Sequence, residues 1–220
     1  MGQEIENIYL KVCEMFSSIQ GESSYAGLPC FFIRLSGCNL RCSFCDTAYA
    51  FDEGTDYPIA QIIDKTKKSG INLVEITGGE PLMQGNTLVL IDQLIRLGFE
   101  VLIETNGSIS IKDVNIKAII IMDIKTPSSG VTEMMNLDNI NHLKPVDEVK
   151  FVISDRRDFD WSVAFIKKYQ LQERCKILFS CAFGVLSPET LTQWILQEKI
   201  NARLNLQIHK YIFRDCDRGV

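Results

Sequence analysis

Three cysteines lie within eight positions of one another in the stretch CNLRCSFC, at Cys38, Cys42 and Cys45. Cysteine thiolates in a reducing compartment suit either zinc or an iron–sulfur cluster. A disulfide would use two of the three thiols, and a structural zinc site takes four ligands. A [4Fe–4S] cluster held by three cysteines instead leaves one iron open to a ligand from outside the protein. The spacing therefore indicates a metal centre with one free coordination position.

Zinc would need a fourth ligand, and Cys30 is the nearest candidate in the sequence. The intervening residues 31–37 read as a strand, which rises about 3.3 Å per residue and would separate the two thiols by roughly 20 Å. This geometry disfavours zinc, although a non-enzymatic zinc-binding interaction module stays an alternative. Purification without oxygen separates the two, because an iron–sulfur protein is brown and contains acid-labile sulfide.

Apolar strand runs alternate with amphipathic helices along the chain. Helices are expected over 58–70, 86–98 and 187–197, and another follows residue 154, with Asp158 near its start and Lys168 near its end. Strands are expected over 31–37, 72–79, 101–107, 116–125, 148–154, 175–180 and 205–213. The alternation predicts one α/β domain, residues 1–220, with a parallel sheet that is open or curled into a partial barrel.

Polar residues follow several of these strands. In a parallel barrel the carboxyl ends of the strands meet at one rim, where such folds build their sites. The residues expected on this rim are Cys38, Gly78-Gly79-Glu80, Glu104-Thr105-Asn106, Asp123-Ile124-Lys125 and Ser180.

The composition is that of an ordinary globular protein, with 46% hydrophobic and 23% charged residues. A net charge of −5 argues against a large nucleic-acid interface, which needs a basic face. The sequence contains neither an apolar run long enough to span a membrane nor a signal peptide at its start. We therefore expect a cytoplasmic protein whose eight cysteines are reduced.

The cysteine spacing, with Phe44 before the last cysteine, resembles the signature of the radical S-adenosylmethionine (SAM) superfamily. The resemblance implies that SAM chelates the open iron and is cleaved to methionine and a 5′-deoxyadenosyl radical. The TGGEP stretch (77–81) resembles the second motif of the superfamily, whose glycines let the backbone approach SAM closely. The SAM contacts implied in this way are Phe44, Asp46, Gly78, Gly79, Glu80, Glu104, Asn106, Asp123, Ile124 and Lys125.

Longer stretches narrow the resemblance to the 7-carboxy-7-deazaguanine synthase family. They cover residues 16–51, 104–108, 123–130 and 206–220. The family's fold is a partial, incomplete TIM-like barrel, and its reaction is that of a carbon–nitrogen lyase. The implied reaction is a radical ring contraction, assisted by Mg²⁺, of 6-carboxy-5,6,7,8-tetrahydropterin to 7-carboxy-7-deazaguanine with loss of ammonia. This product leads to queuosine and related 7-deazapurines. One departure is FSCAFG (179–184), where relatives carry an FSP-type turn.

The resemblance also implies a substrate site and a magnesium site. Glu22 would accept hydrogen bonds from the amino and ring N–H groups of a pterin, and Arg34 would pair with an anion. Thr47 would give a hydroxyl ligand to Mg²⁺ together with the substrate carboxylate. The substrate contacts implied are Ile19, Gln20, Gly21, Glu22, Arg34, Thr77, His209 on the last strand and the terminal carboxylate of Val220.

The partners expected are a small pterin, a flavodoxin- or ferredoxin-type electron donor and a second copy of the chain as a homodimer, with neither nucleic acid nor membrane. A radical SAM activase that installs a glycyl radical on a partner protein is the alternative enzyme. It shares the cysteine spacing but needs a protein-docking surface in place of the IQGE (19–22) and RGV (218–220) stretches.

Overall fold

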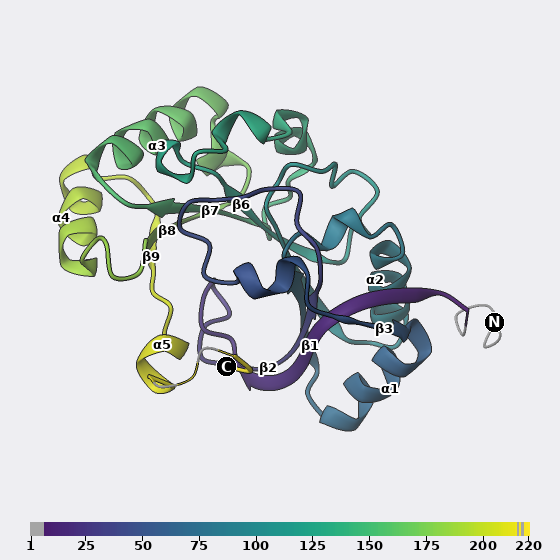
Figure 1. Ribbon diagram of the computed structural model, residues 1–220. Helices are drawn as coiled ribbons and strands as arrows, with labels where there is room; N and C mark the ends of the chain where they lie inside the picture. The colour runs from purple at the N-terminus through teal and green to yellow at the C-terminus, as the bar shows by residue number, and fades with distance from the viewer. Residues whose placement is uncertain (1–6, 215, 217) are drawn as a thin grey trace.

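The computed structural model describes residues 7–214, 216 and 218–220, and a curved sheet forms its centre (Figure 1). The strands are β1 (Tyr9–Ile19), β2 (Pro29–Leu35), β3 (Thr55–Pro58), β4 (Leu73–Gly78), β5 (Glu100–Thr105), β6 (Ile119–Ile124), β7 (Glu148–Ile153), β8 (Lys176–Cys181) and β9 (Arg203–Asn205). The helices are α1 (Ile59–Ser69), α2 (Thr87–Arg96), α3 (Arg156–Tyr169), α4 (Pro188–Glu198) and α5 (His209–Ile212).

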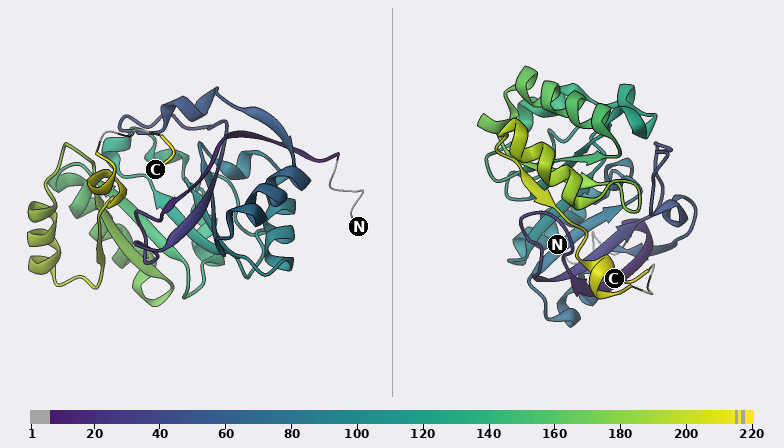
Figure 2. Two further views of the ribbon diagram at one scale, coloured as in Figure 1. Left: turned by 90° about the horizontal axis from the view of Figure 1, so that it is seen from below. Right: turned by 90° about the vertical axis from the view of Figure 1, so that its left-hand side faces the viewer.

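The sheet order is β3-β1-β2-β4-β5-β6-β7-β8-β9, and every pair from β2 to β9 is parallel. Its edge strands β3 and β9 do not pair with each other, so the sheet curls without closing (Figure 2). This confirms the prediction of a partial barrel of parallel strands.

Two strands at one edge were absent from the sequence prediction. β1 runs antiparallel to both β2 and β3, with a register shift between Val12 and Glu14. Its sequence, YLKVCEMFSSI, mixes polar and apolar residues, which fits a strand in which Leu10 and Val12 are buried while the other residues are partly or fully exposed. The prediction that the strands are parallel is therefore wrong for β1 and β3 at this edge of the sheet.

Helices α1 to α4 cover the outer face of the sheet (Figures 1 and 2). Ser187, the predicted N-cap of α4, accepts a hydrogen bond from the Thr190 N–H at 3.1 Å, and Asp155 caps α3 in the same way. α1 ends at Gly70, which adopts a left-handed φ of 69°. α1, α2 and α4 begin and end within two residues of the predicted limits, and α3 follows residue 154 as predicted.

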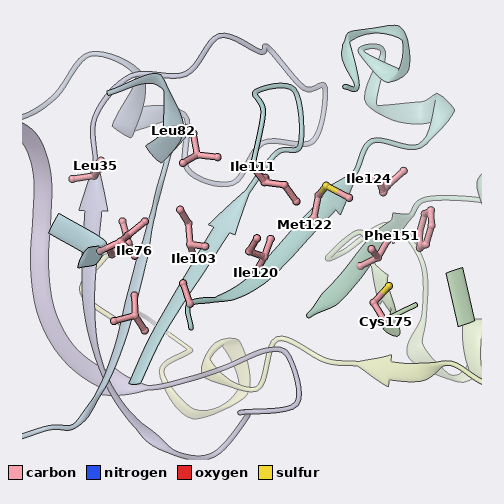
Figure 3. Close-up of a cluster of buried hydrophobic side chains, with 14 of the residues drawn as sticks. Leu35, Ile76, Leu82, Ile103, Ile111, Ile120, Met122, Ile124, Phe151 and Cys175 are labelled. Atoms are coloured by element: carbon pink, nitrogen blue, oxygen red, sulfur yellow. The ribbon is translucent and has the colours of Figure 1, made fainter. Parts of the chain in front are cut away.

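The main hydrophobic core lies between the sheet and these helices (Figure 3). Leu35, Ile76, Ile103 and Met122 project into it from neighbouring strands. Side chains alternate between the two faces of a sheet along each strand. The residues next to these four in their own strands therefore face the concave side. There a smaller apolar cluster forms the floor, from Cys30, Phe32, Leu73, Leu102, Ile119 and Ile121.

The prediction of a last strand over residues 205–213 is wrong for most of this stretch. Only Asn205 belongs to β9, and His209 and Lys210 lie in the one-turn helix α5. Apolar residues in this stretch imitate the alternation of a strand, but the Ile208 N–H donates to the Gly21 carbonyl at 2.9 Å and turns the chain across the barrel mouth.

Among the described residues, no helix is long and apolar enough to cross a membrane. All eight cysteines are free thiols, and the expectation of a reducing compartment stays a prediction. That residues 1–220 form one domain stays a prediction.

Candidate active site

The three cysteines follow β2 and lie against the turn that follows β4. The Glu80 N–H donates to the Gly37 carbonyl at 2.8 Å, and the Gly79 N–H donates to the Leu35 carbonyl at 3.2 Å. A methyl group on Gly79 would lie 2.8 Å from the Cβ of Cys38, closer than real Cβ atoms come. Glycine at position 79 is therefore required by the close approach of the two segments.

N–H donors surround the sulfur of Cys38. The Leu40 N–H lies 3.4 Å from its Sγ, and the Asn106 side-chain amide lies 3.7 Å from it. Asn106 itself is buried, and its backbone N–H donates to Glu80 at 2.6 Å. Such donors stabilise a thiolate and adjust the electronic properties of a bound metal.

Ser43, between Cys42 and Cys45, is anchored to the loop that follows β6. Its backbone N–H donates to the Ser129 carbonyl at 3.1 Å and its hydroxyl to the Ser128 carbonyl at 2.6 Å. The buried carboxylate of Asp158, at the start of α3, accepts from the Ser128 N–H at 2.9 Å. The N-terminus of α3 thus fixes the loop after β6, and this loop holds the cysteine segment. The sequence did not suggest the contact between the loop and the cysteine segment.

Three partly exposed, free thiols on one segment have the chemistry of a three-cysteine [4Fe–4S] ligand set. Burial raises the pKa of the Cys42 thiol, while the Lys125 ammonium nearby opposes this rise. Within the described part of the chain, no three His, Cys, Asp or Glu side chains are already gathered around one metal position. Cluster binding would therefore require the thiols of this segment to turn toward a common centre.

Asp123 and Lys125 lie at the carboxyl end of β6, on the predicted rim, and form an ion pair that the sequence prediction did not include. The Lys125 ammonium lies 2.8 Å from Asp123 Oδ2, and both side chains are almost fully buried. Burial lowers the pKa of Lys125, but Asp123 and Cys42 outweigh it and hold the pKa above its usual value. Asp123 Oδ1 is buried without a partner among the described atoms, so it is available to a donor on a bound ligand.

Glu80 and Ile124, two of the predicted SAM contacts, direct their side chains into the protein. The Glu80 carboxylate accepts hydrogen bonds from Leu82 N–H and from the Thr105 hydroxyl, each at 2.9 Å. The Ile124 side chain is part of the main core. Their side chains therefore stabilise the rim, and a contact of either residue with SAM stays a prediction.

A buried charged layer lies on the concave face above the apolar floor. Lys150 on β7 pairs with Glu104 on β5 and, at 3.0 Å, with Glu22. Burial lowers the pKa of Lys150, but Glu104 and Glu22 raise it well above its usual value. The Thr77 hydroxyl donates to Glu104 at 3.1 Å. Lys150, which the sequence prediction missed, thus joins the predicted residues Glu22 and Glu104, and Thr77 joins them through Glu104.

Ile19 ends β1, and of the residues that follow it Gln20 contacts Glu75 and Glu22 contacts Lys150 in this layer. Glu22 also accepts from Gln207 at 2.8 Å and from Asn205 at 3.2 Å, which come from the C-terminal part of the chain. The imidazole of His209 packs so closely on Gly21 that any side chain there would collide with it.

Arg34 faces the concave side but is already paired within the protein. Its Nε lies 2.7 Å from Glu14 Oε1, and the Tyr49 hydroxyl donates to the same oxygen at 2.9 Å. Glu14 comes from the antiparallel β1, which is why the sequence prediction did not include it. An anion contact by Arg34 stays a prediction.

Asp46 and Thr47 follow the last cysteine. Burial raises the pKa of Asp46, but the Lys210 ammonium, 2.8 Å away, and the Gln207 amide lower it to about 2. The Thr47 hydroxyl has two long contacts, to Asp46 Oδ1 at 3.4 Å and to Cys45 Sγ at 4.0 Å, and its side chain caps no helix. Neither contact is a strong hydrogen bond, and a cation bound by this oxygen stays a prediction.

The C-terminal end returns to the segment that follows these residues (Figure 1). The Arg218 guanidinium binds both oxygens of Glu53, at 2.7 and 2.9 Å, and lies 4.0 Å from the centre of the Tyr49 ring. Val220 is half-buried there, and its contact with substrate stays a prediction.

Comparison with known proteins agrees with this geometry. Residues 32–169 match the model of the radical SAM superfamily. The chain is 38% identical over 226 residues to the 7-carboxy-7-deazaguanine synthase of Koribacter versatilis, covering 96% of this chain and 100% of that protein. It is 40% identical to the synthase of Chlorobaculum tepidum, covering 96% and 97%. The chain belongs to the 7-carboxy-7-deazaguanine synthase family.

This family membership makes the chain a radical SAM enzyme and implies a [4Fe–4S] cluster and SAM as its cofactors. The crystal structure of QueE from Escherichia coli has the same fold, with a TM-score of 0.77 at 21% identity, covering 93% of this chain and 97% of that one.

Zinc as the metal of a non-enzymatic module is disfavoured further by the structure. Cys30, its candidate fourth ligand, is buried among the apolar floor residues of the barrel.

The sequence prediction missed charged residues inside strands and polar residues of the C-terminal segment. Glu75 is the one charged residue in the strand run LVEIT, and Lys150 lies beside Glu148 in the run EVKFV; charged residues inside such apolar runs were the available signal. Asn205 and Gln207 reach Glu22 only because the C-terminal segment crosses the barrel mouth, and nothing local in their sequence indicates this.

Proposed function

We propose that this chain converts 6-carboxy-5,6,7,8-tetrahydropterin to 7-carboxy-7-deazaguanine with release of ammonia. The observation that carries the proposal is the placement of the Gln20–Glu22 segment, Lys150 and Glu104 on the same concave face whose rim holds the three cysteines. The similarity to named synthases over 96% of the chain supports it.

Cys38, Cys42 and Cys45 would hold the cluster, which together with SAM supplies the 5′-deoxyadenosyl radical that removes hydrogen from the substrate. Lys125 would bind the SAM carboxylate, and the unpartnered Oδ1 of Asp123 would accept from a donor on SAM. Gly79 allows the backbone to approach SAM without a side chain between them.

The polar layer would bind the pterin by its ring edge. Glu22 would accept from the amino and ring N–H groups, while Gln20 offers both a donor and an acceptor. His209, packed on Gly21, and Thr77 on β4 would line the same cavity. A heterocycle with the wrong pattern of donors would leave these buried groups unpaired, which discriminates strongly against it.

Thr47 would bind Mg²⁺ together with the carboxylate of the substrate. The hydroxyl lacks a strong partner among the described residues, and a hard oxygen donor is what Mg²⁺ prefers. The ion would fix the orientation of the substrate carboxylate and stabilise negative charge on it during the rearrangement.

The proposal extends to the compartment, the oligomeric state and the electron donor of the enzyme. We infer a cytoplasmic homodimer that receives electrons from a flavodoxin- or ferredoxin-type protein. The open edges of the sheet at β3 and β9 support an association between copies. Light scattering of the purified protein would measure its mass in solution, and a monomer would contradict the dimer.

The test is turnover by protein that has been reconstituted with iron and sulfide without oxygen. It is incubated with SAM, a reductant, Mg²⁺ and carboxytetrahydropterin, and the products are identified by mass spectrometry. We expect 7-carboxy-7-deazaguanine from the wild type and none from Cys42→Ala. Cleavage of SAM without this product would contradict the proposed substrate, and a glycyl radical on an added protein would favour the activase alternative.

A further inference from the structure

Glu75 is a buried carboxyl group that the proposed chemistry leaves without a role. It lies in β4 between Val74 and Ile76, whose side chains enter the main core, so its own side chain faces the concave side. Only 3% of the residue is exposed. Its Oε2 accepts a hydrogen bond from Gln20 Nε2.

Glu75 and Glu22 together allow Gln20 one orientation. A carboxamide has a donor end and an acceptor end of nearly the same shape. Gln20 Nε2 points to Glu75, and its Oε1 accepts from the Glu22 backbone N–H. A reversed amide would place its NH₂ group against that N–H, which is also a donor. The observed orientation leaves one N–H and one lone pair of Gln20 for a ligand.

The charge of Glu75 depends on groups from four neighbouring segments. Burial, the Glu104 carboxylate and, more weakly, Glu22 raise the pKa of Glu75 to about 8, while Gln20 and Lys150 lower it. The Cys30 thiol on β2 also lies near. Lys150 already pairs with both Glu22 and Glu104, so an ionised Glu75 would share this one cation with two other carboxylates.

We propose that Glu75 is a positioning residue that fixes the amide of Gln20, and so the hydrogen-bonding pattern offered to the pterin edge. This inference rests on the proposed function. Protonated, Glu75 accepts from Gln20 through its carbonyl oxygen and adds no charge to the pocket. Ionised, it adds a negative charge beside a site that takes an anionic substrate.

Two substitutions separate the hydrogen bond from the charge. Glu75→Gln keeps an acceptor oxygen and cannot ionise, whereas Glu75→Leu removes the acceptor. Asp147→Asn is the matched control, because it changes a fully buried carboxyl group that bonds the Ile120 N–H at the amino end of the sheet. KM and kcat for carboxytetrahydropterin are measured for each protein from pH 6 to pH 9.5.

For the wild type we expect KM to rise above about pH 8 with kcat little changed. Glu75→Gln should lose this rise, and Glu75→Leu should raise KM about tenfold at every pH, since a buried amide N–H loses its partner. An alkaline rise that persists in Glu75→Gln would overturn the proposal. So would a KM in Glu75→Leu no higher than that in Asp147→Asn.

The side-chain amide signals of Gln20, assigned by NMR with Gln20→Ala, test the pair independently of turnover. They should titrate with an apparent pKa near 8 in the wild type, stay constant in Glu75→Gln and shift in Glu75→Leu. Signals that respond neither to pH nor to Glu75→Leu would overturn the proposal even if turnover is normal. A wild type that shows the titration but converts no carboxytetrahydropterin would refute the proposed function, and with it the pterin part of this inference.

Discussion

Replacing Gly79 with alanine tests the close packing between the turn after β4 and the cysteine segment. The new methyl group would overlap the Gly37 carbonyl and lie 2.6 Å from its carbon and 2.8 Å from the Cβ of Cys38. Restoring a normal contact of about 3.5 Å to these two carbon atoms requires a displacement of roughly 0.7–0.9 Å, and relieving the overlap with the carbonyl oxygen requires more. The atoms that must move are backbone, so a side-chain rotation cannot relieve the overlap.

We expect two effects of different size. Overpacking of this kind lowers the free energy of unfolding by about 1–3 kcal/mol. A displacement approaching 1 Å at a catalytic centre lowers turnover about 100-fold, because the reacting atoms no longer meet in the required geometry. Gly79→Ala should therefore stay folded while its turnover falls and its cluster signal changes.

Gly85→Ala is the matched control, since nothing lies within 4 Å of a methyl group at that position and its φ is not positive. Unfolding is followed by circular dichroism, cluster content by iron and sulfide analysis, and turnover by product formation. Normal turnover and a normal cluster in Gly79→Ala would refute the close packing on which the site geometry depends.

Three further predictions concern the metal, the buried acid and the C-terminal segment. Thr47→Ala should weaken the dependence of turnover on Mg²⁺ and lower activity, whereas Thr47→Ser should keep the Mg²⁺ dependence and the activity of the wild type. Equal Mg²⁺ titrations of the wild type and both variants would contradict Thr47 as a ligand of the ion. The pKa of Glu75 lies above its unfolded value of 4.5, so the native state holds this proton longer and loses stability as pH rises from 4.5 toward 8, by up to about 5 kcal/mol. Urea unfolding of Glu75→Gln should show a weaker decline over this range, and an unchanged slope would contradict the assignment. Lys210→Met removes the cation beside Asp46, so the pKa of this carboxyl, followed by NMR, should rise from about 2 toward its usual value; a constant pKa would show that other groups hold it down.

The parallel part of the fold was predictable because its signals are local. Strand runs such as NLVEITGG (72–79) and caps such as Ser187 depend on neighbours in the sequence, and they agree with the structure. β1 was not predictable in this way, since only its pairing with β2 and β3 makes a mixed stretch a strand.

The rim of the site was predictable for the same reason, because the carboxyl ends of parallel strands must meet there. Asp123, Lys125 and Glu104 lie where the strand positions place them. The partners of Glu22 were not predictable, because Lys150 is 128 residues away and Asn205 is 183 residues away along the chain. The helix at His209 was missed because a tertiary hydrogen bond to Gly21, rather than local periodicity, determines its path.

Electron paramagnetic resonance of the oxygen-free, reconstituted and reduced protein, recorded with and without SAM, tests the central claim most directly. Three thiolates that leave one iron unligated by protein predict the spectrum of a reduced [4Fe–4S] cluster that changes when SAM is added and disappears in Cys42→Ala. A cluster spectrum that does not change when SAM is added would contradict an iron left unligated by protein. A colourless protein that contains zinc would contradict the cluster itself.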